Sequence, residues 1–441
     1  MVKESTIPTF ASNDEWLNQD KEYRLLTRGV YPIVLERGEG CLVWDVEGKE
    51  YIDLMSGQIC VSAGHSHPEL VKAITEQAGR LMQTGFTFTT PEEITLAKKM
   101  AELTPGDLHK SYFANTGSES NEAALRMARF YTNRQEVAAL TDGYHGLTHG
   151  SWSITGISSV LRRGYGPTIP GVVFLPTPNP YRCHFCREKD ACNLSCLEYS
   201  EELLDKTTSG EPAAIILEPL LSSGGVIVPP KEYMQGIRRV CTERGAMMIL
   251  DEAQTGIGRT GRWFACEHFD VVPDILTVSK ALGGAVPLSA TVVKKSIAEK
   301  LDASDFFLIS SHSGDPFLCG VGLANIDIIQ SSGLVENAAR MGAYFKTGLE
   351  DLKDRFEIVG DVRGLGLLLG IEIVNSKDTR EPAPELLHRI WSRCLERGLI
   401  LFGGEHGNIT RIAPPLIITQ DQVDRSLDIL EEAIGLAYEG H

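Results

Sequence analysis

Between Tyr112 and Val293 the chain alternates short runs of apolar and β-branched residues with stretches of helical character. The short runs read SYFAN, VAALT, GVVFLP, AAIILEP, AMMILDE, DILTVSK and ATVV. Strands that alternate with helices are typical of parallel strands joined by crossover helices. The sequence therefore predicts an α/β fold with a large domain built on a mostly parallel, seven-stranded sheet.

The flanking segments have other patterns. Residues 1–30 are polar and predict an arm, whereas Val34 to Asp53 alternates apolar and polar residues around a turn and predicts a hairpin. A helical stretch from Val335 to Phe356 precedes a glycine-broken strand pair, VGDVRGLGLLLGIEIV, and helical spacing returns after Pro384 and Gln420. These patterns predict a smaller α+β domain.

We therefore expect three parts. They are an N-terminal arm and hairpin joining the small domain (1–60), a large domain (61–325) and a C-terminal small domain (326–441). With 42% hydrophobic and 23% charged residues, the 441-residue chain can bury a large core. A net charge of −17 argues against binding to nucleic-acid phosphates, which requires a basic face.

The sequence also bears on cellular location. It contains no run of about 20 apolar residues, so we expect no membrane span. Residues 1–12 lack the apolar core of a signal peptide. Most of the ten cysteines are scattered among apolar neighbours, which is typical of reduced thiols. These features predict a cytoplasmic protein.

An acidic pair stands where open α/β sheets bind ligands. The apolar run AMMIL ends in Asp251 and Glu252, at the carboxyl end of a predicted strand. An acid there can meet a cation or a protonated ring nitrogen, or serve only as a helix cap. Gly256, Gly258 and Gly261 match G-x-G-x-x-G but do not stand directly between a strand and a helix. We therefore expect no dinucleotide site.

A lysine and a helix start are candidate ligand-binding features that complement this acidic pair. Lys280 follows an apolar strand and precedes a glycine-rich turn, where burial would lower its pKa and make it an amine nucleophile. Thr116, Gly117 and Ser118 open an amphipathic helix. The free N–H groups of such a start can bind an anion, although an ordinary helix cap is the alternative.

Three further features suggest contacts with a ligand. Tyr144 and His145 lie between glycines, which would let an aromatic ring lie flat against a planar group. Arg411 is flanked by apolar residues and prolines, and its planar fork suits a carboxylate or a structural ion pair. His65 and His67 form an H-x-H pair without a matching set of carboxylates, so we expect no catalytic metal.

The motifs TGSESNEAAL, YHG, LDEAQTGIGRTG, VSKALGG and RIAPPL occur in an order that resembles the class III aminotransferases. These are pyridoxal 5′-phosphate enzymes of fold type I, and the resemblance extends from Val34 to Leu436. It implies transfer of an amino group from a small-molecule donor to a 2-oxo acid such as pyruvate. It also implies a homodimer or a dimer of dimers with shared active sites.

The resemblance also implies roles for single residues. Lys280 would form a Schiff base with the cofactor and later move protons, and Asp251 would pair with the ring nitrogen. Gln254 would bond the ring oxygen, Tyr144 would stack on the ring, and Ser311 would reach the phosphate in the neighbouring subunit. The implied cofactor-binding residues are Thr116, Gly117, Ser118, Tyr144, His145, Glu218, Asp251, Gln254, Lys280 and Ser311.

Substrate recognition would fall to Gln58, Ser223 and Arg411, with Arg411 binding the α-carboxylate. The segments SGQ, EPLLSSGG, DEAQTG and RIAPPL are similar to the 2,2-dialkylglycine decarboxylases. In that type Gln58, counted as catalytic with Lys280 and Asp251, would hold the carboxylate that leaves as CO₂. Ordinary ω-amino-acid or amine transamination is the alternative, followed by a racemase or lyase on the same scaffold and a non-catalytic cofactor-binding dimer.

Four cysteines form one cluster. Cys183, Cys186, Cys192 and Cys196 have the spacing C-x₂-C-x₅-C-x₃-C in an insertion that the decarboxylase type lacks. Zinc sites usually separate two close pairs by a longer element. Free thiols are therefore the expectation, with zinc and a disulfide left open.

Overall fold

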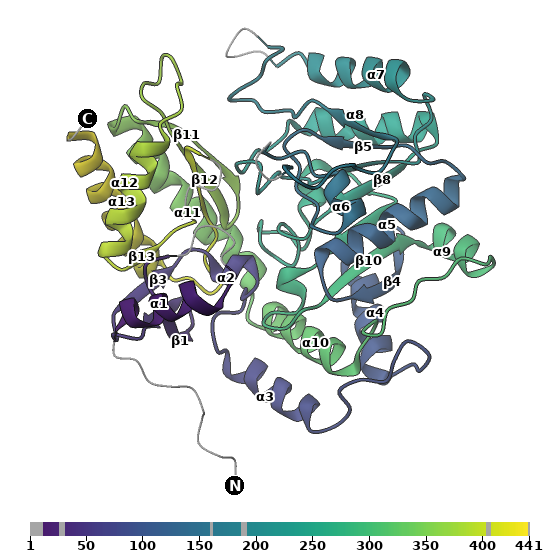
Figure 1. The fold of residues 1–441 in the computed structure, drawn as a ribbon, viewed down its shortest axis with the longest axis horizontal. Helices are drawn as coiled ribbons and strands as arrows, with labels where there is room; N and C mark the ends of the chain where they lie inside the picture. Colours follow the sequence, from purple (N-terminus) through teal and green to yellow (C-terminus); the bar gives the residue numbers. More distant parts are fainter. Residues whose placement is uncertain (1–11, 26–30, 159–161, 187–191, 403–406, 440–441) are drawn as a thin grey trace.

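The computed structural model describes residues 12–25, 31–158, 162–186, 192–402 and 407–439. Its largest element is a seven-stranded sheet with the strand order β4-β10-β9-β8-β7-β5-β6 (Figure 1). The strands are β4 (Leu108–Ala114), β5 (Val137–Leu140), β6 (Val172–Leu175), β7 (Ala214–Leu217), β8 (Met247–Asp251), β9 (Ile275–Val278) and β10 (Ser289–Lys294). β10 is antiparallel to both of its neighbours and the other pairs are parallel. The predicted mostly parallel sheet is thus confirmed.

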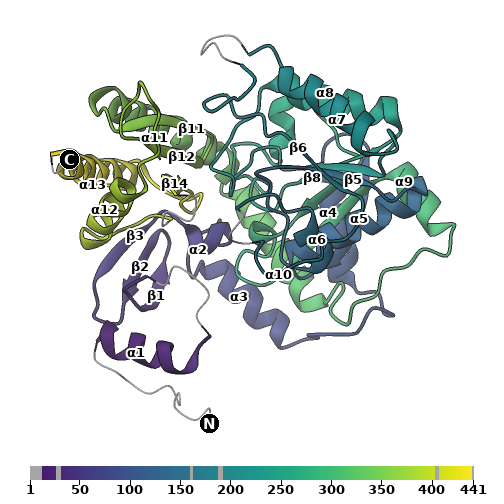
Figure 2. The same ribbon diagram turned by 45° about the horizontal axis from the view of Figure 1, so that its top comes forward.

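Helices cover both faces of this sheet. α7 (Ser195–Thr207) and α8 (Lys231–Arg244) lie on one face, and α5 (Gly117–Thr132) and α6 (His149–Ser153) lie on the other (Figure 2). Every residue of β5, β7 and β9 is buried, as expected for strands covered on both sides. Further helices are α3 (Pro68–Ala78), α4 (Pro91–Leu103), α9 (Lys295–Asp302) and α10 (Pro316–Ser331).

Two smaller sheets stand beside the large one (Figure 1). One contains β1 (Leu35–Glu39), β2 (Leu42–Asp45), β3 (Glu50–Asp53) and β13 (Leu399–Ile400). The other contains β11 (Val359–Leu365), β12 (Leu368–Ile373) and β14 (Ile409–Ile412). α11 (Leu334–Arg355), α12 (Pro384–Glu396) and α13 (Gln420–Glu439) flank these sheets. Because β13 pairs parallel with β3, the N-terminal strands and a C-terminal segment share one sheet.

The structure differs from the expected arm near the N-terminus. Residues Asn13–Tyr23 form α1, capped by the Ser12 hydroxyl, which accepts a hydrogen bond from the Glu15 N–H. The helix is polar on nearly all sides, so it has no apolar stripe that sequence periodicity could reveal. It is fixed by the buried Asn13, whose Nδ2 donates to Asp45 at 3.2 Å. The N-terminal segment thus contains a helix that the sequence pattern did not predict.

The boundary expected between residues 325 and 326 falls inside α10, a largely buried helix. Its apolar residues recur on every side, which blurs the change of pattern that marks a boundary. No single helix in the described ranges is long and apolar enough to cross a membrane, although α10 and α11, bent by 60°, reach that length and composition together.

Candidate active site

The candidate site lies at the carboxyl edge of the large sheet. Asp251 ends β8, Lys280 begins the short helix η2 (Lys280–Leu282) just after β9, and Glu218 directly follows β7. Parallel strands end at the same edge, so these side chains meet in one cavity of about 160 Å³. The cavity is lined by Gly117, Ser118, Asn121, Tyr144, His145, Gly146, Leu147, Glu218, Asp251, Ala253, Gln254 and Lys280.

Asp251 is a buried carboxylate surrounded by hydrogen-bond donors. Its Oδ2 accepts from Asn121 Nδ2 at 2.8 Å and from His145 Nδ1 at 2.9 Å, and its Oδ1 accepts from the Ala253 N–H at 3.0 Å. Burial alone would raise the pKa of Asp251, but these bonds and the nearness of His145 hold that pKa below its ordinary value. The site therefore presents a fixed negative charge at the end of β8.

Lys280 combines a strained backbone with a perturbed amine. Its φ is 46°, a left-handed value that residues with side chains rarely adopt, and such strain is concentrated at functional sites. Burial lowers the pKa of Lys280, although the carboxylates of Asp251 and Glu218 and the thiol of Cys60 act in the opposite direction. An amine with a lowered pKa is a better nucleophile at neutral pH.

The start of α5 closes one end of the cavity. Thr116 Oγ1 accepts from the Glu119 N–H at 3.2 Å, and the Glu119 carboxylate accepts from the Thr116 N–H at 2.9 Å. The N–H groups of Gly117 and Ser118 lie in the first turn, where a helix has no internal acceptors. Gly146 approaches so closely that a Cβ there would lie 2.3 Å from Ser118 Oγ. This end of the cavity suits an anion.

Gln254 links the cavity to Arg411. Its Oε1 accepts from Ser222 Oγ at 2.8 Å and from Arg411 Nη1 at 3.0 Å, and its Nε2 donates to Ser223 Oγ at 2.8 Å. Arg411 is 3% exposed and its guanidinium lies 4.0 Å from the centre of the Phe402 ring. The guanidinium is therefore held firmly beside the cavity.

Glu218 is the second buried carboxyl group of the cavity. Its two oxygens accept from the backbone N–H groups of Tyr144 at 3.0 Å and Ser222 at 3.1 Å. Burial raises the pKa of Glu218 to about 7, with a smaller opposing contribution from His145 and a reinforcing one from Asp251. Glu218 can therefore exchange a proton near neutral pH.

A profile of the family described as Aminotransferase class-III matches residues 26–434. The chain belongs to the class III aminotransferases. An aminotransferase from Schizosaccharomyces pombe, described as uncharacterized, is 38% identical over 407 residues, which are 91% of this chain and 90% of that protein. The leucine/methionine racemase of Thermococcus litoralis is 38% identical over 93% of this chain and 92% of its own length. A crystallised (S)-enantioselective omega-transaminase from Thermomicrobium roseum is 35% identical, with coverage of 98% and 99% and a TM-score of 0.89.

Class III aminotransferases depend on pyridoxal 5′-phosphate, and the cavity of this class III chain suits that cofactor chemically. An anion can meet Ser118 at the helix start, a protonated ring nitrogen can meet Asp251, and an aldehyde can meet the amine of Lys280. The amide of Gln254 can donate to a ring oxygen. Within the described residues, the buried Nε2 of His145 has no hydrogen-bond partner, so this nitrogen is available to bond a further group.

Gln58 lies outside the lining of the cavity, on a strained turn. The residues of α2 (Ser56–Ile59) have φ values of 45°, 56°, 69° and 66°, and a left-handed backbone costs roughly 1–2 kcal/mol for each residue other than glycine. The surroundings hold this turn, because Ser56 Oγ donates to the Ala413 carbonyl at 2.7 Å and accepts from Arg259 Nη2 at 3.2 Å. The side chain of Gln58 is exposed.

The turn nevertheless flanks the cavity. Cys60, two residues after Gln58, lies close enough to Lys280 for each group to perturb the pKa of the other. Thr116 is outside the lining as well, since its hydroxyl is occupied in capping α5. Ser311 is exposed and also outside the lining, and its carbonyl accepts from Gln83 Nε2 at 2.8 Å.

Two residues whose side chains bond the site's polar groups escaped the sequence prediction. Asn121 donates to Asp251 and to the His145 carbonyl, both at 2.8 Å, and Ser222 bonds Gln254. Asn121 stands four residues after Gly117, so helical spacing places both on one side of α5 and could have identified it. Ser222 carried no comparable signal.

The neighbouring motifs have structural roles. Glu252 is fully buried and accepts from the backbone N–H groups of Ala265 at 3.0 Å and Cys266 at 2.8 Å. All ten cysteines lie in the described ranges and are free thiols. The Cys186 N–H donates to Cys183 Sγ at 3.2 Å. Among the described residues, no group of three or more His, Cys, Asp or Glu side chains is arranged to hold a metal ion.

Proposed function

We propose that this class III enzyme transfers an amino group from an α-amino acid to a small 2-oxo acid such as pyruvate. The observation that carries the proposal is the common cavity of Lys280, Asp251 and Gln254, joined to Arg411 by a hydrogen bond. When bound, pyridoxal 5′-phosphate supplies an aldehyde that bonds to amines and a ring that withdraws electrons from the substrate Cα.

Lys280 and Asp251 carry the chemical steps in this proposal. Lys280 Nζ would hold the cofactor through its aldehyde, and once freed by the substrate amine it would be placed to move a proton to or from the reacting carbon atoms. Burial lowers the pKa of Lys280, which favours the uncharged amine that this role needs. Asp251 keeps the ring nitrogen protonated, and its bonds from Asn121 and His145 fix the carboxylate for that purpose.

Other residues hold the cofactor in place. The N–H groups of Gly117 and Ser118 bind the phosphate, with Thr116 acting as the cap that directs them. Tyr144 stacks on one ring face, and the Gln254 amide donates to the ring oxygen. These assignments agree with the position of each residue on or beside the cavity.

Arg411 is proposed to bind the substrate α-carboxylate through its planar fork. Ser223 lies beside it through their shared partner Gln254. Glu218, with its pKa near 7, adjusts the charge of this region as the substrate arrives. This role of Arg411 favours a small α-amino acid over an amine without a carboxylate as the donor.

Decarboxylation of the donor is the finer part of the proposal, and Gln58 supports it. The bond that breaks at Cα must stand perpendicular to the cofactor ring so that its electrons enter the π system. An amide can donate one hydrogen bond to a carboxylate held there without neutralising it. Ordinary ω-amino-acid or amine transamination, in which the Cα proton takes that position, is the alternative.

A homodimer or a dimer of dimers is part of the proposal. Large apolar side chains that are more than half exposed occur in two segments. One is residues 81–88, which include Gln83, and the other is residues 307–309, shortly before Ser311 in the sequence. The exposed side chains are Leu81, Met82, Phe86, Phe88, Phe307 and Ile309. Exposed apolar residues in such number are typical of an interface. A second copy of the chain would cover these side chains. Ser311 of each subunit would then reach the phosphate of the cofactor bound in the other subunit.

The purified enzyme loaded with pyridoxal 5′-phosphate should convert 2-aminoisobutyrate and pyruvate into alanine, acetone and CO₂. Alanine formed from ordinary amino acids without CO₂ would support amino transfer but contradict the decarboxylating part. No alanine from any donor would contradict the proposal as a whole. Lys280→Ala, measured in the same assay, should lose turnover while it remains folded by circular dichroism.

A racemase is the second candidate, favoured by the 38% identity to the leucine/methionine racemase. Racemisation uses the same cavity but returns the Cα proton to the opposite face without a 2-oxo acid. A single L-amino acid, supplied without an acceptor, would then lose optical activity at a constant total concentration. Unchanged optical activity with several small L-amino acids would contradict this candidate.

A further inference from the structure

Arg363, Gly370 and Arg411 form one row across β11, β12 and β14, because Gly370 pairs with both arginines. Directly opposed residues share a face of a sheet, so the two arginines flank Gly370 on one face. A Cβ on Gly370 would lie 2.8 Å from the Cβ of Val226. Val226 belongs to the hairpin Leu221–Ile227, whose ends are joined by hydrogen bonds of 3.0 and 3.1 Å. The hairpin thus packs against Gly370, between Arg363 and Arg411.

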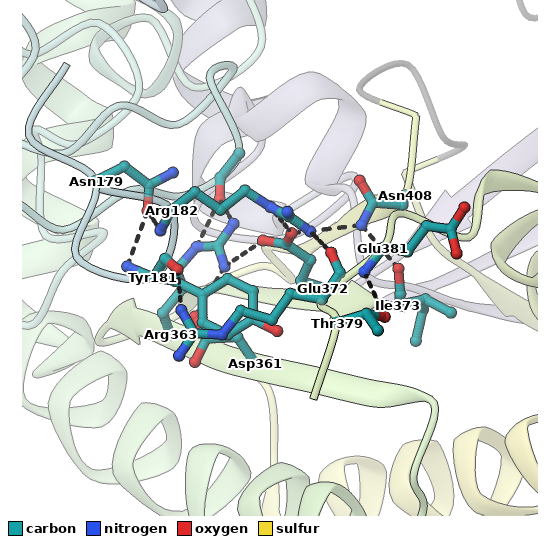
Figure 3. Close-up of polar contacts among 12 residues, drawn as sticks. Asn179, Tyr181, Arg182, Asp361, Arg363, Glu372, Ile373, Thr379, Glu381 and Asn408 are labelled. Atoms are coloured by element: carbon teal, nitrogen blue, oxygen red, sulfur yellow. Dashed lines mark hydrogen bonds and ion pairs between the residues drawn. The ribbon is translucent and has the colours of Figure 1, made fainter. Parts of the chain in front are cut away.

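Arg363 holds this hairpin with one edge of its guanidinium. Its Nε and Nη2 donate to the same carbonyl oxygen, that of Gly225, at 2.9 and 2.7 Å. Its Nη1 donates to the carboxylates of Asp361 at 2.8 Å and Glu372 at 2.7 Å (Figure 3). These contacts engage both edges of a side chain that is only 10% exposed. Arg363 is therefore built to fix the hairpin rather than to receive a ligand.

Glu372 fixes Arg363 in turn. It is fully buried, and its Oε1 accepts from Arg182 Nε and from Asn408 Nδ2 while its Oε2 accepts from Arg363. Figure 3 shows Arg182, Arg363 and Asn408 gathered around this carboxylate. Two carboxylates, Asp361 and Glu372, thus face two guanidiniums. The opposed charges keep Arg363 in one orientation.

The hairpin supplies polar partners to Gln254 and Arg411, the residue proposed to bind the substrate carboxylate. Ser222 and Ser223, near its tip, bond the two ends of the Gln254 amide at 2.8 Å each. Arg411 Nη1 reaches the same Gln254 Oε1 at 3.0 Å and Ser222 Oγ at 3.4 Å. Gly225, held by Arg363, donates its N–H to the Ser222 carbonyl at 3.2 Å. The position of Arg363 is thus transmitted to Arg411 through one short turn.

We propose that Arg363, locked by Glu372, is a positioning residue that sets the affinity of Arg411 for the substrate carboxylate. The inference rests on the proposed function, because it takes Arg411 as the carboxylate receptor. It predicts that loss of Arg363 weakens recognition of carboxylates while cofactor loading is retained. A residue that only stabilised the fold would affect both properties together.

The test measures the binding of propionate, an unreactive monocarboxylate, to the cofactor-loaded enzyme by calorimetry. Arg363→Lys keeps the charge but cannot donate two bonds to Gly225. The double variant Arg363→Met/Glu372→Met removes the buried pair together, a change that folded proteins often tolerate. Both variants should weaken propionate binding by about tenfold or more, as expected for loss of a charged hydrogen bond. Asp361→Asn, which leaves Gly225 and Glu372 bonded to Arg363, should change it by less than about twofold.

Propionate affinity equal to wild type in both Arg363 variants would overturn the inference. So would an equal loss of affinity for pyridoxal 5′-phosphate, or wild-type enzyme that does not bind propionate. Turnover is scored separately. Wild-type enzyme that binds propionate but transfers no amino group would contradict the proposed function, and the propionate data would still decide the role of Arg363.

Discussion

Glu218 makes the stability of the folded protein depend on pH. Burial raises its pKa to about 7, from an ordinary value of 4.5. Between these two values the folded protein keeps a proton that the unfolded chain has released, so stability falls as pH rises. The loss amounts to about 3 kcal/mol of unfolding free energy across this window if Glu218 acts alone. Urea unfolding of wild type and Glu218→Gln between pH 4.5 and 7 measures it.

The variant should be less stable at the acid end, because an amide cannot accept from both the Tyr144 and Ser222 N–H groups. Its unfolding free energy should nevertheless depend less on pH than that of wild type. Parallel pH curves for the two proteins would contradict the assigned pKa.

Some residues of the site could be predicted because local sequence carries their signal. Asp251 and Lys280 each follow a short apolar run that is typical of a buried strand, and strand ends in such sheets face ligands. Arg411 was marked by its apolar and proline neighbours, whereas Gln254 followed only from resemblance. The role of Arg363 depends on a row of residues across three strands and on a hairpin more than 100 residues earlier, which no local pattern could indicate.

The helix α5 shows how one element both folds and presents a site. The capping box of Thr116 and Glu119 fixes where the helix begins, and the next two residues, Gly117 and Ser118, line the cavity. Thr116→Ala removes the acceptor of the Glu119 N–H and should lower the unfolding free energy by about 1 kcal/mol. Equilibrium denaturation measures this loss.

Thr95→Ala in α4 is the matched control. Its hydroxyl is exposed and donates only to the Pro91 carbonyl within the helix, so it caps nothing. Alanine is the better helix former, and this variant should be as stable as wild type or slightly more stable. An equal effect of the two substitutions would contradict the capping role of Thr116.

The elements also show where sequence patterns fail. The strands β4 to β10 were predictable because their runs are apolar and their spacing is regular. α1 was missed because a helix without an apolar stripe resembles a polar arm. The left-handed turn of α2 was equally hidden, since Ser56, Gln58 and Ile59 have side chains that normally exclude such a backbone.

At the scale of the whole molecule, the candidate site is assembled from distant parts of the chain. The large sheet supplies Asp251, Glu218 and Lys280, the three-stranded sheet supplies Arg411, and the N-terminal segment supplies the turn with Gln58. The position of Arg411 relative to the cavity therefore depends on contacts between sheets. The positions of Asp251, Glu218 and Lys280 are fixed within one sheet. The role proposed for Ser311 requires a second copy of the chain.

The central claim is that Lys280 is the residue that bonds pyridoxal 5′-phosphate. Borohydride reduction of the loaded whole protein makes this bond permanent, and mass spectrometry of its peptides then locates the modified lysine. The account predicts one cofactor group per chain, on Lys280. Modification of a different lysine, or none in folded protein saturated with the cofactor, would contradict it.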